Sequence, residues 1–84
     1  MSEVLCRQTD LRGANLNAAN LQSAILYEAN LGGALLLKSN LEDANLRGAN
    51  LEGADFREAN LKAVDLDRAN LKGARLDKAN LEGA

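Results

Sequence analysis

Few side chains in this sequence could carry out chemistry. Its 84 residues include no histidine and no tryptophan, and Cys6 is the only cysteine. A zinc site of the His/Cys type, a Ser-His-Asp triad and an intrachain disulfide are therefore excluded. Two carboxylate pairs remain, Asp65 with Asp67 and Glu42 with Asp43. Such pairs can bind a divalent cation or transfer protons.

The charge pattern favours a simpler role for these carboxylates. Acidic residues number 12 against 10 basic ones, the net charge is −2, and both signs are scattered along the chain. We expect the pairs to be solvated surface charges, because no nucleophile–base pair accompanies them. The sequence therefore predicts no catalytic residue, no cofactor and no metal site, and its charge does not suit a nucleic-acid clamp.

The elements that would position any site follow a repeat of five residues. A large apolar residue occupies every fifth position, a small residue precedes it by two positions, and Asn or Asp mostly stands between them. The large residues are Leu11, Leu16, Leu21, Leu26, Leu31, Leu36, Leu41, Leu46, Leu51, Phe56, Leu61, Leu66, Leu71, Leu76 and Leu81. Cys6 extends this register, so we expect a buried thiol. The register runs from about residue 4 to residue 84 and predicts a single domain over 1–84.

A five-residue period fits neither a regular helix nor a long strand. Five residues advance an α-helix by roughly 500°, so successive leucines would spiral around it. In a strand the same step moves each leucine to the opposite face. A chain that turns once per repeat can bury them, with the small residue and the leucine inward and the Asn or Asp outward. The next two residues then form a corner, and Gly at the second of them, as in Gly33 and Gly53, can adopt a positive φ.

Repeats such as Ala14-Asn15-Leu16, Ala19-Asn20-Leu21 and Ala49-Asn50-Leu51 resemble the A-(D/N)-L-x-x pattern of pentapeptide-repeat proteins, in a composition similar to cyanobacterial members. The resemblance implies an all-β fold, a right-handed quadrilateral parallel β-helix with about four coils of about 20 residues. It also implies an alternative function, since some members mimic duplex DNA and bind the topoisomerase DNA gyrase. A mimic requires a strongly negative rod, which a net charge of −2 does not provide.

Five apolar residues occupy positions that are polar in most repeats. If residues 20 apart stack, Leu5, Ile25 and Tyr27 share one face, and Leu35 and Leu37 lie on the opposite face. Such residues are either tolerated surface side chains or a contact surface. We take these five as the candidate interaction surface.

Asparagines that are 20 apart should form ladders along the stack, in which side-chain amides hydrogen-bond to one another. One predicted ladder contains Asn30, Asn50 and Asn70, and another contains Asn20, Asn40, Asn60 and Asn80.

The predicted function is a non-enzymatic structural or protein–protein interaction module. Its partner would be an unidentified protein or a second copy, bound through an uncapped end of the coil or through the apolar outward positions. The N-terminus lacks the basic start and apolar run of a secretory signal, and no apolar stretch is long enough to span a membrane. We expect a cytoplasmic location and no contact with membranes or nucleic acid.

Overall fold

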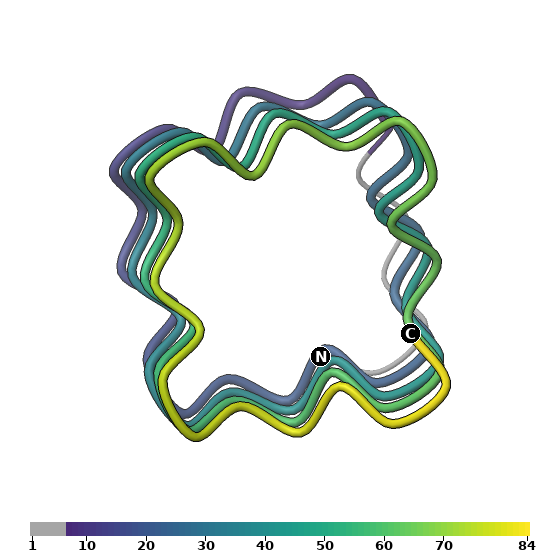
Figure 1. The fold of residues 1–84 in the computed structure, drawn as a ribbon. Coiled ribbons are helices and arrows are strands. Elements are labelled where there is room, and N and C mark those ends of the chain that lie inside the picture. The colour runs from purple at the N-terminus through teal and green to yellow at the C-terminus, as the bar shows by residue number, and fades with distance from the viewer. Residues whose placement is uncertain (1–6) are drawn as a thin grey trace.

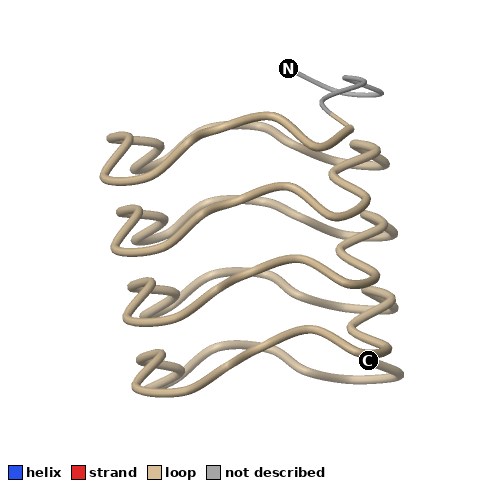
Figure 2. Cartoon of the chain, turned by 90° about the horizontal axis from the view of Figure 1, so that it is seen from above, coloured by secondary structure: helices blue, strands red, loops and turns tan. Residues whose placement is uncertain are grey.

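The computed structural model describes residues 7–84, which wind into a coil with four sides (Figure 1). Within these residues no helix and no continuous strand forms. Single-residue parallel bridges join the coils instead, and each bridge links residues 20 apart, as in Asp10 with Asn30 and Asn30 with Asn50. Figure 2, seen at right angles to the coil axis, shows successive turns of the chain stacked on one another as rungs. The predicted register, with one repeat on each side, is confirmed. Leu5 and Cys6, for which the sequence predicted an exposed and a buried side chain, lie outside the described residues.

Each corner of the coil is a tight turn that begins at a leucine. The N–H of Ala34 donates to the carbonyl oxygen of Leu31 over 2.9 Å, and Gly33 between them has a φ of +68°. A positive φ at the third residue alone is the signature of a type II turn. The predicted use of glycine at this position is therefore confirmed. Among residues 7–84, ten non-glycine residues also adopt a positive φ, including Lys38 at +59°.

The repeat at residues 30–34 shows where the backbone N–H groups are bound. Those of residues 30, 31 and 33 donate to carbonyl groups of neighbouring coils over 2.7–2.9 Å, and that of residue 34 closes the turn. The N–H of Gly32 donates to Oδ1 of Asn30 over 3.1 Å. We call this last contact the Asx bond, and the position that provides it the Asx position. It explains why Asn or Asp precedes most of the leucines, because it satisfies the one N–H that the coil itself leaves unpaired.

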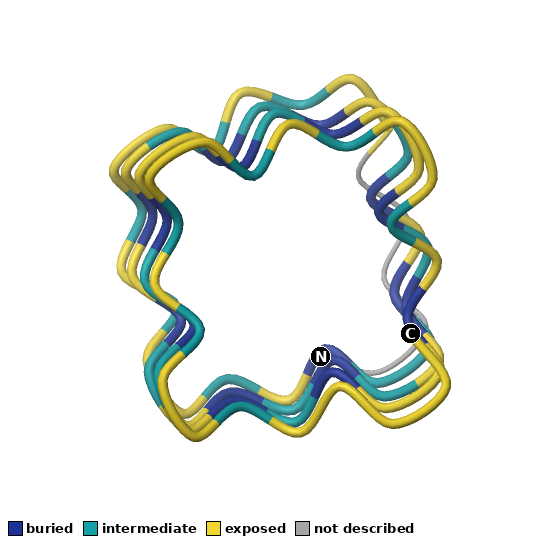
Figure 3. Ribbon diagram, in the orientation of Figure 1, coloured by how far each residue is buried: buried dark blue, intermediate teal, exposed yellow. Residues whose placement is uncertain are grey.

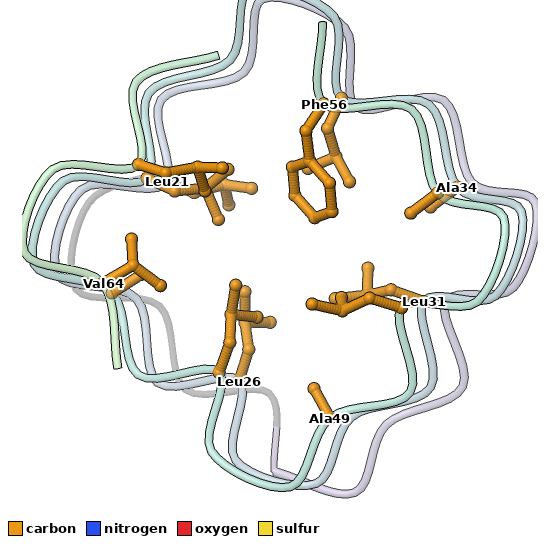
Figure 4. Packing of buried hydrophobic residues seen from close by; sticks show 14 of the residues in the cluster. Leu21, Leu26, Leu31, Ala34, Ala49, Phe56 and Val64 are labelled. Atoms are coloured by element: carbon orange, nitrogen blue, oxygen red, sulfur yellow. The ribbon is translucent and has the colours of Figure 1, made fainter. Parts of the chain in front are cut away.

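The inward side chains fill the coil with stacked leucines and alanines (Figure 4). Leu21, Leu41 and Leu61 form one column and are each at most 2% exposed. Phe56 lies in the column of Leu36 and is equally buried. Figure 3 shows that the buried segments line the interior while the corners are exposed. The hydrophobic core therefore runs along the axis of the stack, and the Asx positions and corner residues carry columns of outward side chains on each side.

Burial decreases toward the C-terminal rung. Leu41 is fully buried, whereas Leu81 is 41% exposed, and Leu66, Leu71 and Leu76 are only partly buried. These side chains point inward like the others, but no later coil of the described chain covers them.

Candidate functional site

The outward side chains form columns on four sides of the coil, because successive rungs repeat every 20 residues. We call the side formed by the repeats centred on Leu26, Leu46 and Leu66 the tyrosine face. The side formed by the repeats centred on Leu16, Leu36, Phe56 and Leu76 is the leucine face. Ten residues, half of one coil, separate the two faces, so they lie on opposite sides of the molecule.

The predicted interaction residues fall on both faces. Ile25 and Leu35 occupy Asx positions and are 41% and 40% exposed. Tyr27 and Leu37 stand two residues further along and are partly buried. The structure brings Ile25 together with Tyr27 and Leu35 together with Leu37, but it does not join the two pairs into one surface. Leu5 lies outside the described residues.

The tyrosine face is hollowed beside Ile25. A shallow, open depression of about 490 Å³ is lined by Arg7, Ile25, Tyr27 and Asn45. These residues come from three successive rungs. The lining combines an apolar wall with a guanidinium, a phenol and an amide. Protein pockets of this volume typically pair apolar walls with a few polar groups that orient a ligand.

Asn45 presents a hydrogen-bond donor at this hollow. Its Oδ1 accepts the N–H of Arg47 in an Asx bond of 3.0 Å. In the asparagine ladder, by contrast, Nδ2 of Asn50 donates to Oδ1 of Asn30, one coil earlier, over 3.1 Å. The residue one coil before Asn45 is Ile25, which has no side-chain acceptor. Within residues 7–84, Nδ2 of Asn45 therefore has no side-chain partner.

Arginines flank the hollow along the coil axis. Tyr27 stands in one column with Arg7, one coil earlier, and Arg47, one coil later. Arg47 forms an ion pair of 3.1 Å with Asp67 in the following coil. Arg7 is exposed and forms no ion pair with another residue of the described chain. Arg7 therefore places a positive charge without an ion-pair partner in the described chain at this side of the hollow.

Two polar groups of the leucine face, a backbone N–H and a carboxylate, are bound within the scaffold. Leu35 provides no Asx bond, so the N–H of Leu37 donates to Oδ1 of Asn17, one coil earlier, over 2.9 Å. In the next coil, Nη2 and Nε of Arg57 donate to the carboxylate of Asp55 over 2.7 and 2.9 Å. These hydrogen bonds are the main reason why the pKa of Asp55 lies below its usual range. The Leu37 N–H and the Asp55 carboxylate thus have partners within the chain, whereas the Lys38 ammonium forms no ion pair with another residue of the described chain.

The sequence matches the family of Pentapeptide repeats in eight copies, over residues 1–36, 24–62 and 54–84. The chain belongs to the pentapeptide-repeat family. The resemblance inferred from the repeats is therefore confirmed. No curated protein matches the sequence significantly.

Several solved pentapeptide-repeat structures resemble this one. A pentapeptide repeat protein from the thylakoid lumen of Arabidopsis thaliana has a TM-score of 0.94 and 32% identity, with 98% of this chain and 57% of that chain covered. HetL, involved in heterocyst differentiation regulation in the cyanobacterium Nostoc, has a TM-score of 0.53 and 34% identity, with 100% and 45% covered. A further Nostoc protein has a TM-score of 0.54 and 38% identity, with 80% and 60% covered. This pentapeptide-repeat chain thus spans 45–60% of the length of these three relatives.

The carboxylate pairs of this pentapeptide-repeat chain have structural contacts. Oδ1 of Asp65 accepts the N–H of Asp67 over 3.0 Å, and Oε2 of Glu42 accepts the Asn60 amide over 3.3 Å. Asp43 occupies a corner with a φ of +61°. Over residues 7–84 no group of three His, Cys, Asp or Glu side chains is arranged to hold a metal ion. A search of the same residues finds no helix with the length and apolar character needed to cross a membrane.

Sequence reasoning missed two ion pairs in this pentapeptide-repeat scaffold. Arg12 binds Asp10 at 2.8 Å, and Arg57 binds Asp55 at 2.7 Å. Hydrogen bonds from Arg12 lower the pKa of Asp10 to about 2. The signal for both pairs was the spacing Asp-x-Arg, because the Asx position and the residue two later point outward from the same side. Both aspartates also provide Asx bonds, so the pairs belong to the scaffold.

Proposed function

We propose that this chain is a non-enzymatic protein–protein interaction module, built on a right-handed quadrilateral parallel β-helix of about four coils. The observation that carries the proposal is the exposure of Ile25 and Leu35 at Asx positions. Each is followed two residues later by a second apolar side chain, Tyr27 or Leu37, so each face has an apolar pair.

Folding does not explain these four side chains. An aliphatic residue at the Asx position removes the usual acceptor of one backbone N–H; Asn17 replaces that acceptor behind Leu35, but Ile25 forgoes a hydrogen bond of a kind that contributes about 1 kcal/mol to stability. It also leaves apolar surface in water. The core is complete without these side chains, because they point away from it and take no part in the backbone hydrogen bonds between coils. Contact with a partner gives a physical reason to retain them.

The scaffold suits recognition because it is rigid. Three N–H groups of a repeat such as 30–34 donate to neighbouring coils and a fourth closes the turn. The backbone of such a scaffold loses little conformational freedom on binding, which reduces the entropic cost of association.

The alternative function, binding of DNA gyrase by mimicry of duplex DNA, is not favoured by any feature of this surface. The most acidic side of the coil carries Glu42, Asp43 and Glu82, but Lys62 lies among them. A duplex mimic needs a dense, uninterrupted row of negative charge. We therefore expect no effect on gyrase supercoiling at micromolar concentrations of the chain.

The interaction function can be tested one face at a time. Ile25→Asn and Leu35→Asn each restore the residue type that the repeat uses at this position, so both variants should fold. Lys62→Asn, at a corner of a third face, is the control. We expect capture of a cellular protein, or self-association measured by light scattering, to be lost in one of the first two variants and retained in the control. Association that persists in both Ile25→Asn and Leu35→Asn would contradict the proposal.

A further inference from the structure

The polar groups around the hollow of the tyrosine face are mainly donors. The Arg7 guanidinium carries donors and no acceptor. The Oδ1 of Asn45 already accepts one hydrogen bond, its Asx bond, whereas its Nδ2 hydrogens have no side-chain partner within residues 7–84. The hydroxyl of Tyr27 can donate as well. A ligand that fits this lining must therefore present acceptors, and the positive charge of Arg7 favours an anionic one.

The remaining lining is apolar, since Ile25 is 41% exposed beside the ring of Tyr27. We propose that this hollow binds a carboxylate side chain of an extended segment of a partner protein, with a neighbouring aliphatic side chain packed on Ile25 and Tyr27. Arginine and an amide N–H are well suited to a carboxylate, because the guanidinium can bind both of its oxygens. The inference rests on the proposed interaction function and specifies the site and the chemistry of the partner.

Nearby acidic groups do not already fill this role within the described chain. The carboxylate of Glu28, next to Tyr27, accepts the Gln8 amide over 2.9 Å. Asp67 is paired with Arg47. On the leucine face Arg57 is bound to Asp55, while Lys38 stands at an exposed corner. The tyrosine face combines unused donors and exposed apolar surface in one hollow, which can seat a carboxylate.

The shape of the hollow favours an extended segment. Its lining comes from three rungs, which at the usual spacing of about 4.8 Å between strands extend over about 10 Å. An extended chain covers this distance with about three residues. A tripeptide with a central acidic residue is thus the smallest probe that tests both parts of the proposal.

The experiment is a heteronuclear NMR titration of the full chain with acetyl-Ile-Glu-Ile-amide and acetyl-Ile-Gln-Ile-amide. We expect shift changes around residues 25–28 and 45–48, and at least tenfold tighter binding of the Glu peptide. Asn45→Asp keeps the Asx acceptor but replaces the donor by a negative charge, and Asp already occupies this position at Asp65. It should weaken binding at least tenfold, as should Arg7→Gln. Asn40→Asp, the same change on another face, should leave binding unaltered.

Two results would overturn the carboxylate site. One is equal affinity for the two peptides, and the other is binding of the Glu peptide that neither Asn45→Asp nor Arg7→Gln weakens. Its failure is distinguishable from that of the interaction function. A captured protein that is lost on Ile25→Asn but retained by Asn45→Asp overturns the carboxylate site and leaves the interaction function standing. Binding of the Glu peptide at the hollow, with no cellular protein captured, supports the site and counts against the function.

Discussion

Replacing Leu41 by alanine should destabilise the protein far more than Leu81→Ala, although both leucines hold the same position in the repeat. Leu41 is fully buried and Leu81 is 41% exposed. Removing three carbon groups from a buried leucine loses about 2.4 kcal/mol of transfer free energy, and the cavity raises the cost to about 3 kcal/mol or more. Leu81 loses less transfer free energy and leaves no enclosed cavity, so we expect a cost of about 1 kcal/mol.

Urea unfolding followed by circular dichroism measures both free energies, provided that the denaturant slope stays constant between variants. Repeat stacks can unfold in stages, and a changed slope would reveal this. In a thermal scan each 1 kcal/mol corresponds to about 4–8 °C in a domain of this size. Leu41→Ala should therefore lower the Tm by roughly 12 °C or more, and Leu81→Ala by less than about 8 °C. Equal losses would refute this reasoning, because they would mean that the C-terminal rung is covered in solution.

Three further predictions concern the backbone network and its charges. Asn17→Ala removes the acceptor of the Leu37 N–H and should lower the free energy of unfolding in urea by about 1 kcal/mol. Gly53→Val places a β-branched side chain at a φ of +69° and should cost about 2 kcal/mol, whereas Ala63→Gly at the equivalent turn position should change stability by less than about 1 kcal/mol. The pKa of Asp55 is lowered from its ordinary value of 3.8, so its stabilising contribution is complete above that value and is lost as the pH falls through the lower folded pKa. The urea midpoint should accordingly fall as the pH is lowered below about 4, and Asp55→Asn should reduce this fall.

The coil could be predicted from the sequence because a period of five leaves few ways to bury every leucine. Bridges such as Asn40 with Asn60 confirm the register of 20 residues. The predicted ladder of Asn30, Asn50 and Asn70 is present, with Nδ2···Oδ1 bonds of 3.1 and 3.5 Å, whereas in the second ladder the bond found within the described residues runs from Nδ2 of Asn60 to Oδ1 of Asn40 over 3.3 Å. Regular spacing alone determines these features, whichever residues fill the corners.

Two features became evident only from the coordinates: the positive φ of the non-glycine corner residues and the hydrogen bonds that the Asx side chains accept. Lys38 and Glu58 adopt positive φ, which local preference opposes. Hydrogen bonds to the adjacent coils over-determine the corner conformation: the N–H of Lys38 donates to the carbonyl of Arg57 over 3.0 Å. The role of Asn or Asp as the acceptor for a turn N–H depends on that same geometry. Propensities assigned residue by residue include neither the hydrogen bonds between coils nor the Asx bonds.

The hollow was also beyond prediction from the sequence, because its lining combines side chains from three rungs. Sequence spacing placed Ile25 and Tyr27 on one face, but it did not reveal that Ile25 leaves the amide of Asn45 without an acceptor. That donor appears only when the column is considered as a unit. A single substitution at an Asx position therefore changes the hydrogen-bonding capacity of the next coil as well as its own.

This coupling makes Ile25→Asn informative about selection as well as structure. The variant should gain an Asx bond to the N–H of Tyr27 and an acceptor for Nδ2 of Asn45, so its free energy of unfolding should rise by about 1 kcal/mol. If Ile25 is retained for contact with a partner, the more stable variant should bind less well. Natural proteins commonly give up stability at functional positions in this way. Greater stability with undiminished binding would instead identify Ile25 as an incidental surface residue.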